Sequence, residues 1–149
     1  MLLTDKVEIV LRRKGSEVWT IGPDNTVFEA LQLMAEKNVG ALVVVKDDKV
    51  AGILSERDYA RKLILQGKIS RETSVREVMS ARVIGVSPNH QVDQCLQLMT
   101  THRVRHLPVL KSEVLVGIVS IGGLTNWIIS AQASMIDQLE HYIYGQGAG

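Results

Sequence analysis

The chain has 149 residues, of which 46% are apolar and 22% are charged, the proportions of an ordinary globular protein. It holds 17 Lys and Arg residues against 16 Asp and Glu residues, and the resulting net charge of +1 disfavours a dedicated nucleic-acid-binding surface. The single cysteine excludes an intramolecular disulfide and a multi-cysteine zinc site. Because the first residues lack a basic stretch followed by an apolar run, we expect no signal peptide and a cytoplasmic location.

The sequence contains an internal duplication. A shift of 65 residues places residues 18–59 on residues 83–124 without a gap, and 14 of these 42 positions are then identical. Chance would give only a few identities, so the chain holds two copies of one unit. The predicted organisation is a leader (1–17), a first repeat (18–66), a linker (67–82), a second repeat that includes a C-terminal helix (83–140) and a tail (141–149).

The first repeat opens with a short extended stretch before Pro23. Thr26 and Glu29 then form the capping-box pattern of a helix start. Apolar residues follow at the spacing of an amphipathic helix, namely Val27, Ala30, Leu31 and Met34. Two apolar strands are predicted over 41–46 and 50–55, joined by a tight turn at Asp47-Asp48, and a helix over 56–66 ends the unit.

The second repeat has the same order of elements. An amphipathic helix carries Val92, Cys95, Leu96 and Met99, and we expect Cys95 to be a small buried side chain. Strands are predicted over 106–111 and 115–120 with a tight turn at Ser112-Glu113, followed by a helix over 124–140. One such unit cannot cover both faces of its sheet. The predicted fold class is therefore α+β, with two β-α-β-β-α repeats packed sheet to sheet about a pseudo-twofold axis.

One uncharged segment, residues 114–136, is long enough to span a bilayer. It also contains several Ser, Thr, Asn and Gln residues, and Gly122-Gly123 interrupts it. We expect a buried strand, a glycine turn and then a helix, and no membrane partner.

Three features of the repeats resemble a tandem pair of CBS domains, the regulatory module named after cystathionine β-synthase. They are the two Gly-Ile-hydrophobic-Ser strands, the Val-Arg-His-Leu-Pro-Val segment (104–109) and the Ser-Glu-Arg-Asp run (55–58). The wider run 52–68 resembles small stand-alone bacterial CBS-pair proteins. The resemblance implies a homodimer that binds an adenine nucleotide between the repeats (AMP first, with ATP, ADP or NAD as alternatives) and signals through its conformation or an unidentified protein effector.

The resemblance also implies two ligand clefts, each with one wall from each repeat. Cleft one would be formed by Ile53, Ser55, Arg57, Asp58, Val83, Ile84, Val104, Arg105, His106 and Pro108. Cleft two would be formed by Val18, Trp19, Val39, Gly40, Ala41, Val43, Ile118 and Ser120, together with Gly122 and Gly123.

The residues make the two clefts chemically unequal. In cleft one Asp58 can accept the ribose hydroxyls, and Arg57, Arg105 and His106 can bind phosphate. In cleft two Gly123 stands in place of this carboxylate, and Gly40 and Ala41 stand in place of the arginine and histidine. We therefore expect cleft two to bind weakly, with Trp19 at its mouth available to stack on a ring.

Structural and alternative functional interpretations remain open beside these. Ser55 and Asp58 also form an ordinary helix start, and Arg61 and Lys62 are expected on a solvated face. The spacing of His102 and His106 resembles a metal site, but a strand begins between them, so no metal is expected.

No catalytic motif occurs in the sequence, so we expect no enzyme activity and no catalytic cofactor. The alternative function is a scaffold or dimerisation protein with vestigial clefts. The apolar helix 124–140 needs a partner, and a second copy of the chain is the expected one.

Overall fold

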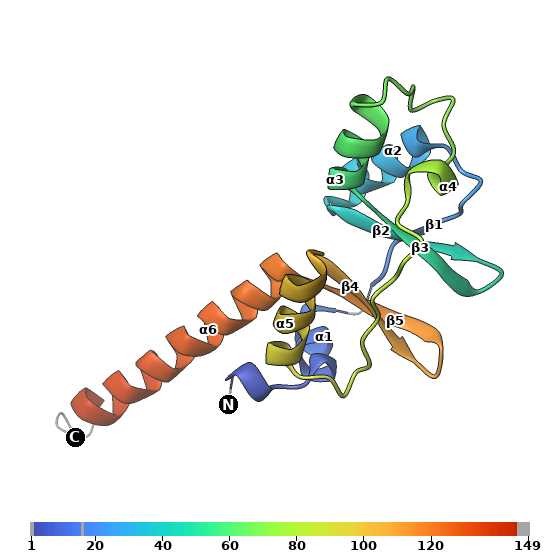
Figure 1. Ribbon diagram of the computed structural model, residues 1–149. Helices are drawn as coiled ribbons and strands as arrows, with labels where there is room; N and C mark the ends of the chain where they lie inside the picture. Colours follow the sequence, from blue (N-terminus) through green and yellow to red (C-terminus); the bar gives the residue numbers. More distant parts are fainter. Residues whose placement is uncertain (1, 16, 146–149) are drawn as a thin grey trace.

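The computed structural model describes residues 2–15 and 17–145 (Figure 1). The first repeat contains β1 (Thr20–Ile21), α2 (Val27–Lys37), β2 (Ala41–Lys46), β3 (Lys49–Ser55), α3 (Glu56–Asp58) and the π-helical segment η2 (Tyr59–Ile64). The second contains α5 (Val92–His102), β4 (His106–Lys111), β5 (Val114–Ser120), α6 (Ile121–Glu140) and η3 (His141–Gly145). A short η1 (Leu2–Thr4) and α1 (Val7–Lys14) precede them, and α4 (Val75–Val78) lies between them. Met1 and Ser16 of the expected leader, and 146–149 of the expected tail, lie outside the described residues.

The two repeats have nearly the same backbone. β2 pairs antiparallel with β3, and β4 pairs antiparallel with β5 in the equivalent register. The pairing register shifts at the same place in each hairpin, between Val44 and Val45 and between Val109 and Leu110. Both hairpins turn through two residues of positive φ, 51° and 63° at Asp47-Asp48 and 50° and 68° at Ser112-Glu113. Such turns match the twist of the flanking strands, and both predicted tight turns are confirmed.

The repeats differ at their first strand. In the first repeat β1 pairs parallel with β2, which gives a three-stranded sheet. At the equivalent place in the second repeat, only the single parallel bridge between Val86 and Val109 is present among the described residues. The expected first strand of that repeat is therefore reduced to one residue pair.

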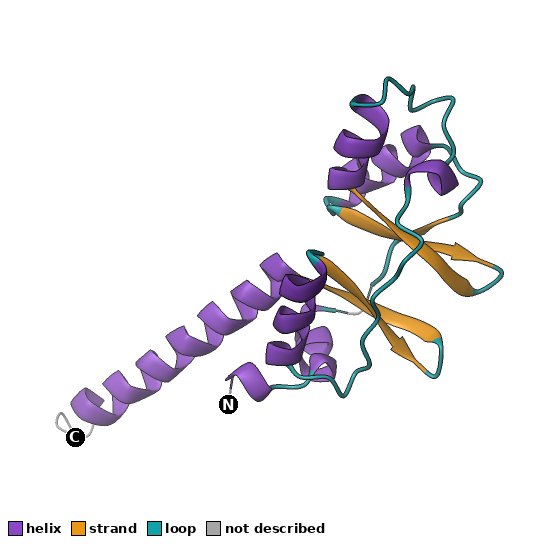
Figure 2. Cartoon of the chain, in the orientation of Figure 1, coloured by secondary structure: helices purple, strands orange, loops and turns teal. Residues whose placement is uncertain are grey.

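The two hairpins lie side by side with the helices of each repeat on the outer sides (Figure 2), so the predicted α+β arrangement of two sheet-to-sheet repeats is confirmed. The chain between the repeats runs along both hairpins. Ile53 and Ser80 exchange backbone hydrogen bonds of 3.0 and 2.9 Å, and Val86 donates to Pro108 at 3.0 Å. This segment therefore connects β3 of one repeat directly to β4 of the other.

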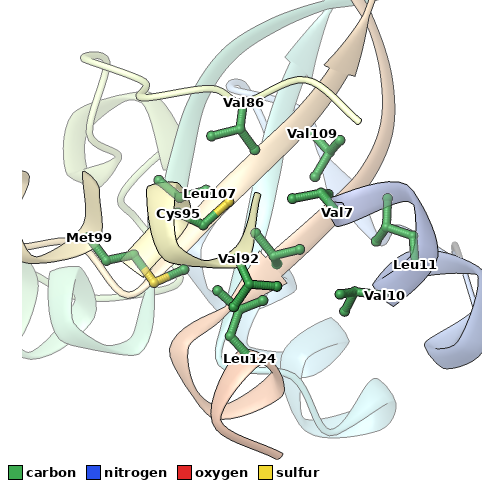
Figure 3. Close-up of a cluster of buried hydrophobic side chains, with 11 residues drawn as sticks. Val7, Val10, Leu11, Val86, Val92, Cys95, Met99, Leu107, Val109 and Leu124 are labelled. Atoms are coloured by element: carbon green, nitrogen blue, oxygen red, sulfur yellow. The ribbon is translucent and has the colours of Figure 1, made fainter. Parts of the chain in front are cut away.

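Each repeat has its own hydrophobic core, and each core takes in a helix from outside the duplicated region. α4 places Val75 and Val78 in the first core. α1 places Val7 and Val10 in the second, where they meet Val92 and Leu124 (Figure 3). The Val7 backbone donates to the carbonyl of His90 at 2.8 Å, and the Val75 backbone donates to the carbonyl of Asn25 at 2.8 Å. Asn25 and His90 are equivalent positions of the two repeats, 65 residues apart. The leader helix thus covers the second repeat in the way that α4 covers the first.

Cys95 lies in the second core, as expected. Burial, with a smaller contribution from the nearby Asp93 carboxylate, raises the pKa of its thiol to about 11. The thiol is therefore protonated at neutral pH and acts as a small apolar side chain.

The long helix α6 corrects one expectation. It begins at Ile121 directly after β5, because the Ser120 hydroxyl caps it by accepting from the backbone of Gly123 at 3.0 Å. The expected glycine turn is therefore wrong, and Gly122-Gly123 lie in the first helical turn. The first half of α6 packs on the second core through Leu124, Trp127 and Ile128, whereas the second half projects from the body (Figure 1). Among the described residues no helix is apolar enough over a sufficient length to span a membrane.

Candidate functional site: a cationic cavity between the repeats

A cavity of about 640 Å³ lies between the repeats, within the size range of small-molecule sites. All ten residues assigned from the sequence to cleft one line it, although they come from three separate stretches of the chain: Ile53, Ser55, Arg57, Asp58, Val83, Ile84, Val104, Arg105, His106 and Pro108. Eight further residues complete the lining: Gly40, Glu56, Arg61, Lys62, Ser80, Arg82, His102 and Arg103.

Three of these further residues add to the sequence expectations. The resemblance places Gly40 in cleft two, but Gly40 lines this cavity, and its backbone carbonyl accepts from Glu56 at 3.1 Å, at the start of α3. Arg61, which is exposed as expected, and Lys62, which is partly exposed, also line the cavity, because η2 continues α3 along its edge. Ser80 and Arg82 were missed because they lie outside the duplicated units, in the segment that crosses between the hairpins.

The wall from the first repeat is organised by the start of α3. The Ser55 hydroxyl accepts from the Asp58 backbone at 3.2 Å, and Asp58 Oδ2 accepts from the Ser55 backbone and hydroxyl at 3.1 and 3.0 Å. The other carboxylate oxygen, Oδ1, lies 3.2 Å from Lys62 Nζ, which also donates to the Ser80 hydroxyl at 3.3 Å. The helix-start interpretation is thus confirmed, and the same carboxylate is held in the cavity by three polar contacts.

The wall from the second repeat is the corner between α5 and β4. α5 ends at Arg103 in a left-handed conformation (φ 54°, ψ 44°), and β4 begins at His106. Arg57 Nη1 donates to the Arg103 carbonyl at 3.2 Å, so a side chain of the first repeat hydrogen-bonds the backbone of the second. The positions equivalent to Arg57 and Arg103, each in the opposite repeat, are Gly122 and Asn38. Because glycine has no side chain that could donate, this hydrogen bond has no counterpart across the pseudo-twofold axis.

His106 is held in its neutral form. Burial lowers its pKa below the ordinary value of 6.5, and the charges of Lys14 and Arg105 lower it further. At neutral pH this ring therefore offers one N–H donor and one acceptor nitrogen rather than a positive charge. The positive charge of the cavity therefore comes from its arginines and its lysine.

Most of the residues assigned to cleft two lie outside this cavity. Among them, all within the described ranges, only Gly40 lines the 640 Å³ cavity. Ala41 and Val43 are buried in β2, Ile118 and Ser120 belong to β5, and Val18, Trp19 and Val39 flank the first sheet.

Two contacts alter the expected chemistry of cleft two. Lys37 Nζ lies 4.3 Å from the centre of the Trp19 ring, so a cation already covers one face of the ring that was expected to stack on a ligand. Lys14 Nζ lies 3.6 Å from where a Cβ at Gly123 would stand. The leader thus brings next to Gly123 a cation that the repeat alignment does not contain.

The comparisons with known proteins agree with the fold. The CBS domain profile matches residues 10–65 and 75–130. The mitochondrial CBS domain-containing protein CBSX3 of Arabidopsis thaliana is 41% identical over 136 residues, which cover 88% of this chain and 66% of that protein. The chain thus spans just under two thirds of that relative.

Solved structures share the arrangement of both repeats. A CBS-domain protein from Burkholderia ambifaria is 45% identical, with a TM-score of 0.83 over 86% of this chain and 96% of that one. The CBS domain pair of protein MJ0100, solved with 5′-methylthioadenosine and S-adenosyl-L-methionine, has a TM-score of 0.76 over 86% of this chain and 98% of that one, but is 22% identical. With two matched domains on two equivalent halves and a cavity between them, the chain belongs to the CBS-domain family, whose tandem pairs are regulatory ligand-binding modules.

Proposed function

We propose that this chain senses an adenine nucleotide in the cavity between its repeats, with AMP first and ATP, ADP or NAD as alternatives. One observation carries the proposal: the carboxylate of Asp58 and the cations of both repeats line a single cavity of ligand size. A nucleotide needs this combination, since its ribose hydroxyls donate to a carboxylate and its phosphates accept from guanidinium groups.

The two walls suggest how the ligand is oriented. Asp58 is fixed at the start of α3, so the ribose lies at this end of β3. Arg57 and Arg105, one from each repeat, receive the phosphate. The apolar side chains of Ile53, Ile84 and Val104 remain for the base.

A signal would arise because a ligand that touches both repeats favours one arrangement of them. The Arg57 to Arg103 hydrogen bond already joins the repeats at 3.2 Å, and a phosphate competes for the same guanidinium. Ligand binding shifts the equilibrium between arrangements by no more than its difference in affinity for them. A protein effector that reads this difference completes the pathway.

We also propose that the chain is a homodimer through the projecting half of α6. Ile129, Ile136 and Leu139 are each more than half exposed and follow one another at seven and three residues, the spacing of a coiled-coil seam. No Asp, Glu, Lys or Arg occurs from 114 to 136, and the first charged residues of α6 are Asp137 and Glu140, near its end.

Calorimetric titration of the full chain with AMP, ATP, NAD and S-adenosylmethionine tests the sensor function. Binding of at least one nucleotide well below millimolar concentration is expected. If none of them binds below millimolar, the sensor function is wrong and the scaffold alternative, for which the exposed half of α6 is the favouring observation, takes its place.

A further inference from the structure

The cavity has a large excess of positive charge. Six Lys and Arg residues line it (Arg57, Arg61, Lys62, Arg82, Arg103 and Arg105), against the two carboxylates of Glu56 and Asp58. The cavity thus carries +4 in a chain whose total is +1, so the remainder of the chain carries −3. A local field of this kind attracts anions and is stronger in a cleft than on an open surface.

Most of this charge is not neutralised within the protein. Asp58 is engaged by Lys62 and by the helix start, and Arg57 donates to a backbone carbonyl. The other four, Arg61, Arg82, Arg103 and Arg105, form no ion pair with any carboxylate in the described part of the chain.

The four unpaired arginines come from three separate elements. Arg61 belongs to η2, Arg82 to the segment between the hairpins, and Arg103 and Arg105 to the corner before β4. One phosphate group can be reached by two guanidinium groups in bidentate contacts. Four guanidinium groups around one cavity, in addition to Arg57, match a chain of phosphates rather than a single one.

We propose that the cavity selects ligands with a polyphosphate chain, so that a nucleoside triphosphate binds more tightly than the monophosphate. The inference rests on the proposed function for the nucleoside part and goes beyond it for the phosphate part. It replaces the order that the family resemblance implies and that the proposed function adopts, in which AMP comes first. It also disfavours S-adenosylmethionine, whose sulfonium is positive, although the MJ0100 pair was solved with that ligand.

The test is a set of calorimetric titrations of the full chain without divalent cations, with adenosine, AMP, ATP and inorganic tripolyphosphate as probes. ATP should bind at least about tenfold more tightly than AMP, because each added phosphate gains charge-assisted hydrogen bonds. The affinity for ATP should also fall more steeply with added salt than the affinity for AMP. Equal affinities for ATP and AMP, or no binding of either, would overturn the inference.

The probes separate this inference from the proposed function. If tripolyphosphate binds as tightly as ATP and adenosine alone does not bind, polyphosphate selection stands and nucleotide sensing fails. If AMP and ATP bind equally and adenosine alone binds measurably, nucleotide sensing stands and polyphosphate selection fails.

A pair of substitutions assigns the selectivity to the cavity. Arg82→Gln with Arg103→Gln removes two exposed, unpaired guanidinium groups and should leave folding intact. The ratio of ATP to AMP affinity should fall by about tenfold or more. The control, Lys46→Gln with Lys49→Gln, also removes two positive charges, from exposed positions outside the cavity, and should leave the ratio unchanged. A ratio that falls equally in both variants would mean that overall charge, not this cavity, sets the preference.

Discussion

Asp58 has two roles in this structure that a substitution can separate. Its carboxylate caps α3 and ion-pairs with Lys62, and in the proposed function it also accepts the ribose hydroxyls. Asp58→Ala should abolish measurable nucleotide binding and cost about 1 kcal/mol of stability through the lost cap. Titration calorimetry and urea unfolding measure the two effects, and sedimentation should show an intact dimer.

Glu29→Ala provides the matched control for this prediction. Glu29 closes the same kind of capping box at the start of α2, with Thr26 as its partner, outside the cavity. It should lose similar stability and keep its nucleotide affinity. If Asp58→Ala behaves in the same way, cleft one is misassigned.

His106 makes stability depend on pH in a defined direction. Its pKa is lowered by burial first and by Lys14 and Arg105 next, so the folded chain binds its proton less readily than the unfolded chain does. As the pH falls below 6.5 the unfolded state gains that proton first, and the free energy of unfolding decreases. Above pH 6.5 the ring is neutral in both states, so His106 does not lower the free energy of unfolding there.

His106→Gln removes this proton and keeps a polar side chain of similar size. The loss of thermal stability between pH 7.5 and 5.5 should be smaller in this variant than in the unaltered chain. The exposed His141→Gln should follow the unaltered chain. If all three proteins lose the same stability, protonation of His106 is not linked to folding.

At the scale of elements, two equivalent glycines mark where a segment from outside the duplicated region packs closely on each hairpin. A Cβ at Gly52 would stand 2.8 Å from the backbone oxygen of Ser80 and 2.7 Å from Met79 Sδ. A Cβ at the equivalent Gly117 would stand 2.8 Å from the Leu11 side chain of α1. Both hairpins therefore use a glycine where another segment crosses them closely.

Gly52→Ala should destabilise the chain by about 1–3 kcal/mol, because the backbone of Ser80 must move away from β3. The same shift displaces Ser80 and Arg82 from the cavity wall, so nucleotide affinity should fall as well. Urea unfolding and calorimetry measure these changes. Gly122→Ala is the control, since nothing lies within 4 Å of its Cβ and alanine favours the helix. A Gly52→Ala variant as stable as the control would show that the crossing segment yields without cost.

The same elements show what the sequence could predict. Duplication at a fixed shift identified every pair of equivalent residues, and because Ser55 and Asp58 act locally their capping contacts followed directly. The contributions of α1, Lys14, Ser80 and Arg82 could not be found in this way. These residues lie outside the duplicated stretch, and only the three-dimensional path of the chain brings them to the opposite repeat or between the hairpins.

At the scale of the whole molecule, α6 divides into two halves with different partners. The first half is covered by its own chain: Trp127 Nε1 donates to Asp5 Oδ2 at 3.0 Å, and Arg13 lies 5.4 Å from the Trp127 ring centre. From Gln132 to Ile143 every residue is exposed, and five of them are large and apolar (Met135, Ile136, Leu139, Tyr142 and Ile143). The chain itself therefore covers only the first half of this apolar helix, and the second half stays exposed within the described part of the chain.

A second copy should supply the other half of the contact. Ile136→Asp places a charge in the centre of the proposed seam and should convert the dimer to a monomer at micromolar concentration, because an unpaired buried charge opposes association. Analytical ultracentrifugation measures the change. Ser134→Asp adds the same charge on the opposite side of the helix, two residues away, and should remain dimeric. Since Ile136 is exposed in the single chain and lies far along α6 from the cavity, the monomer should fold and bind nucleotide as before, which would place assembly and ligand recognition in separate parts of the molecule. A dimer that survives Ile136→Asp would mean that the two copies meet elsewhere.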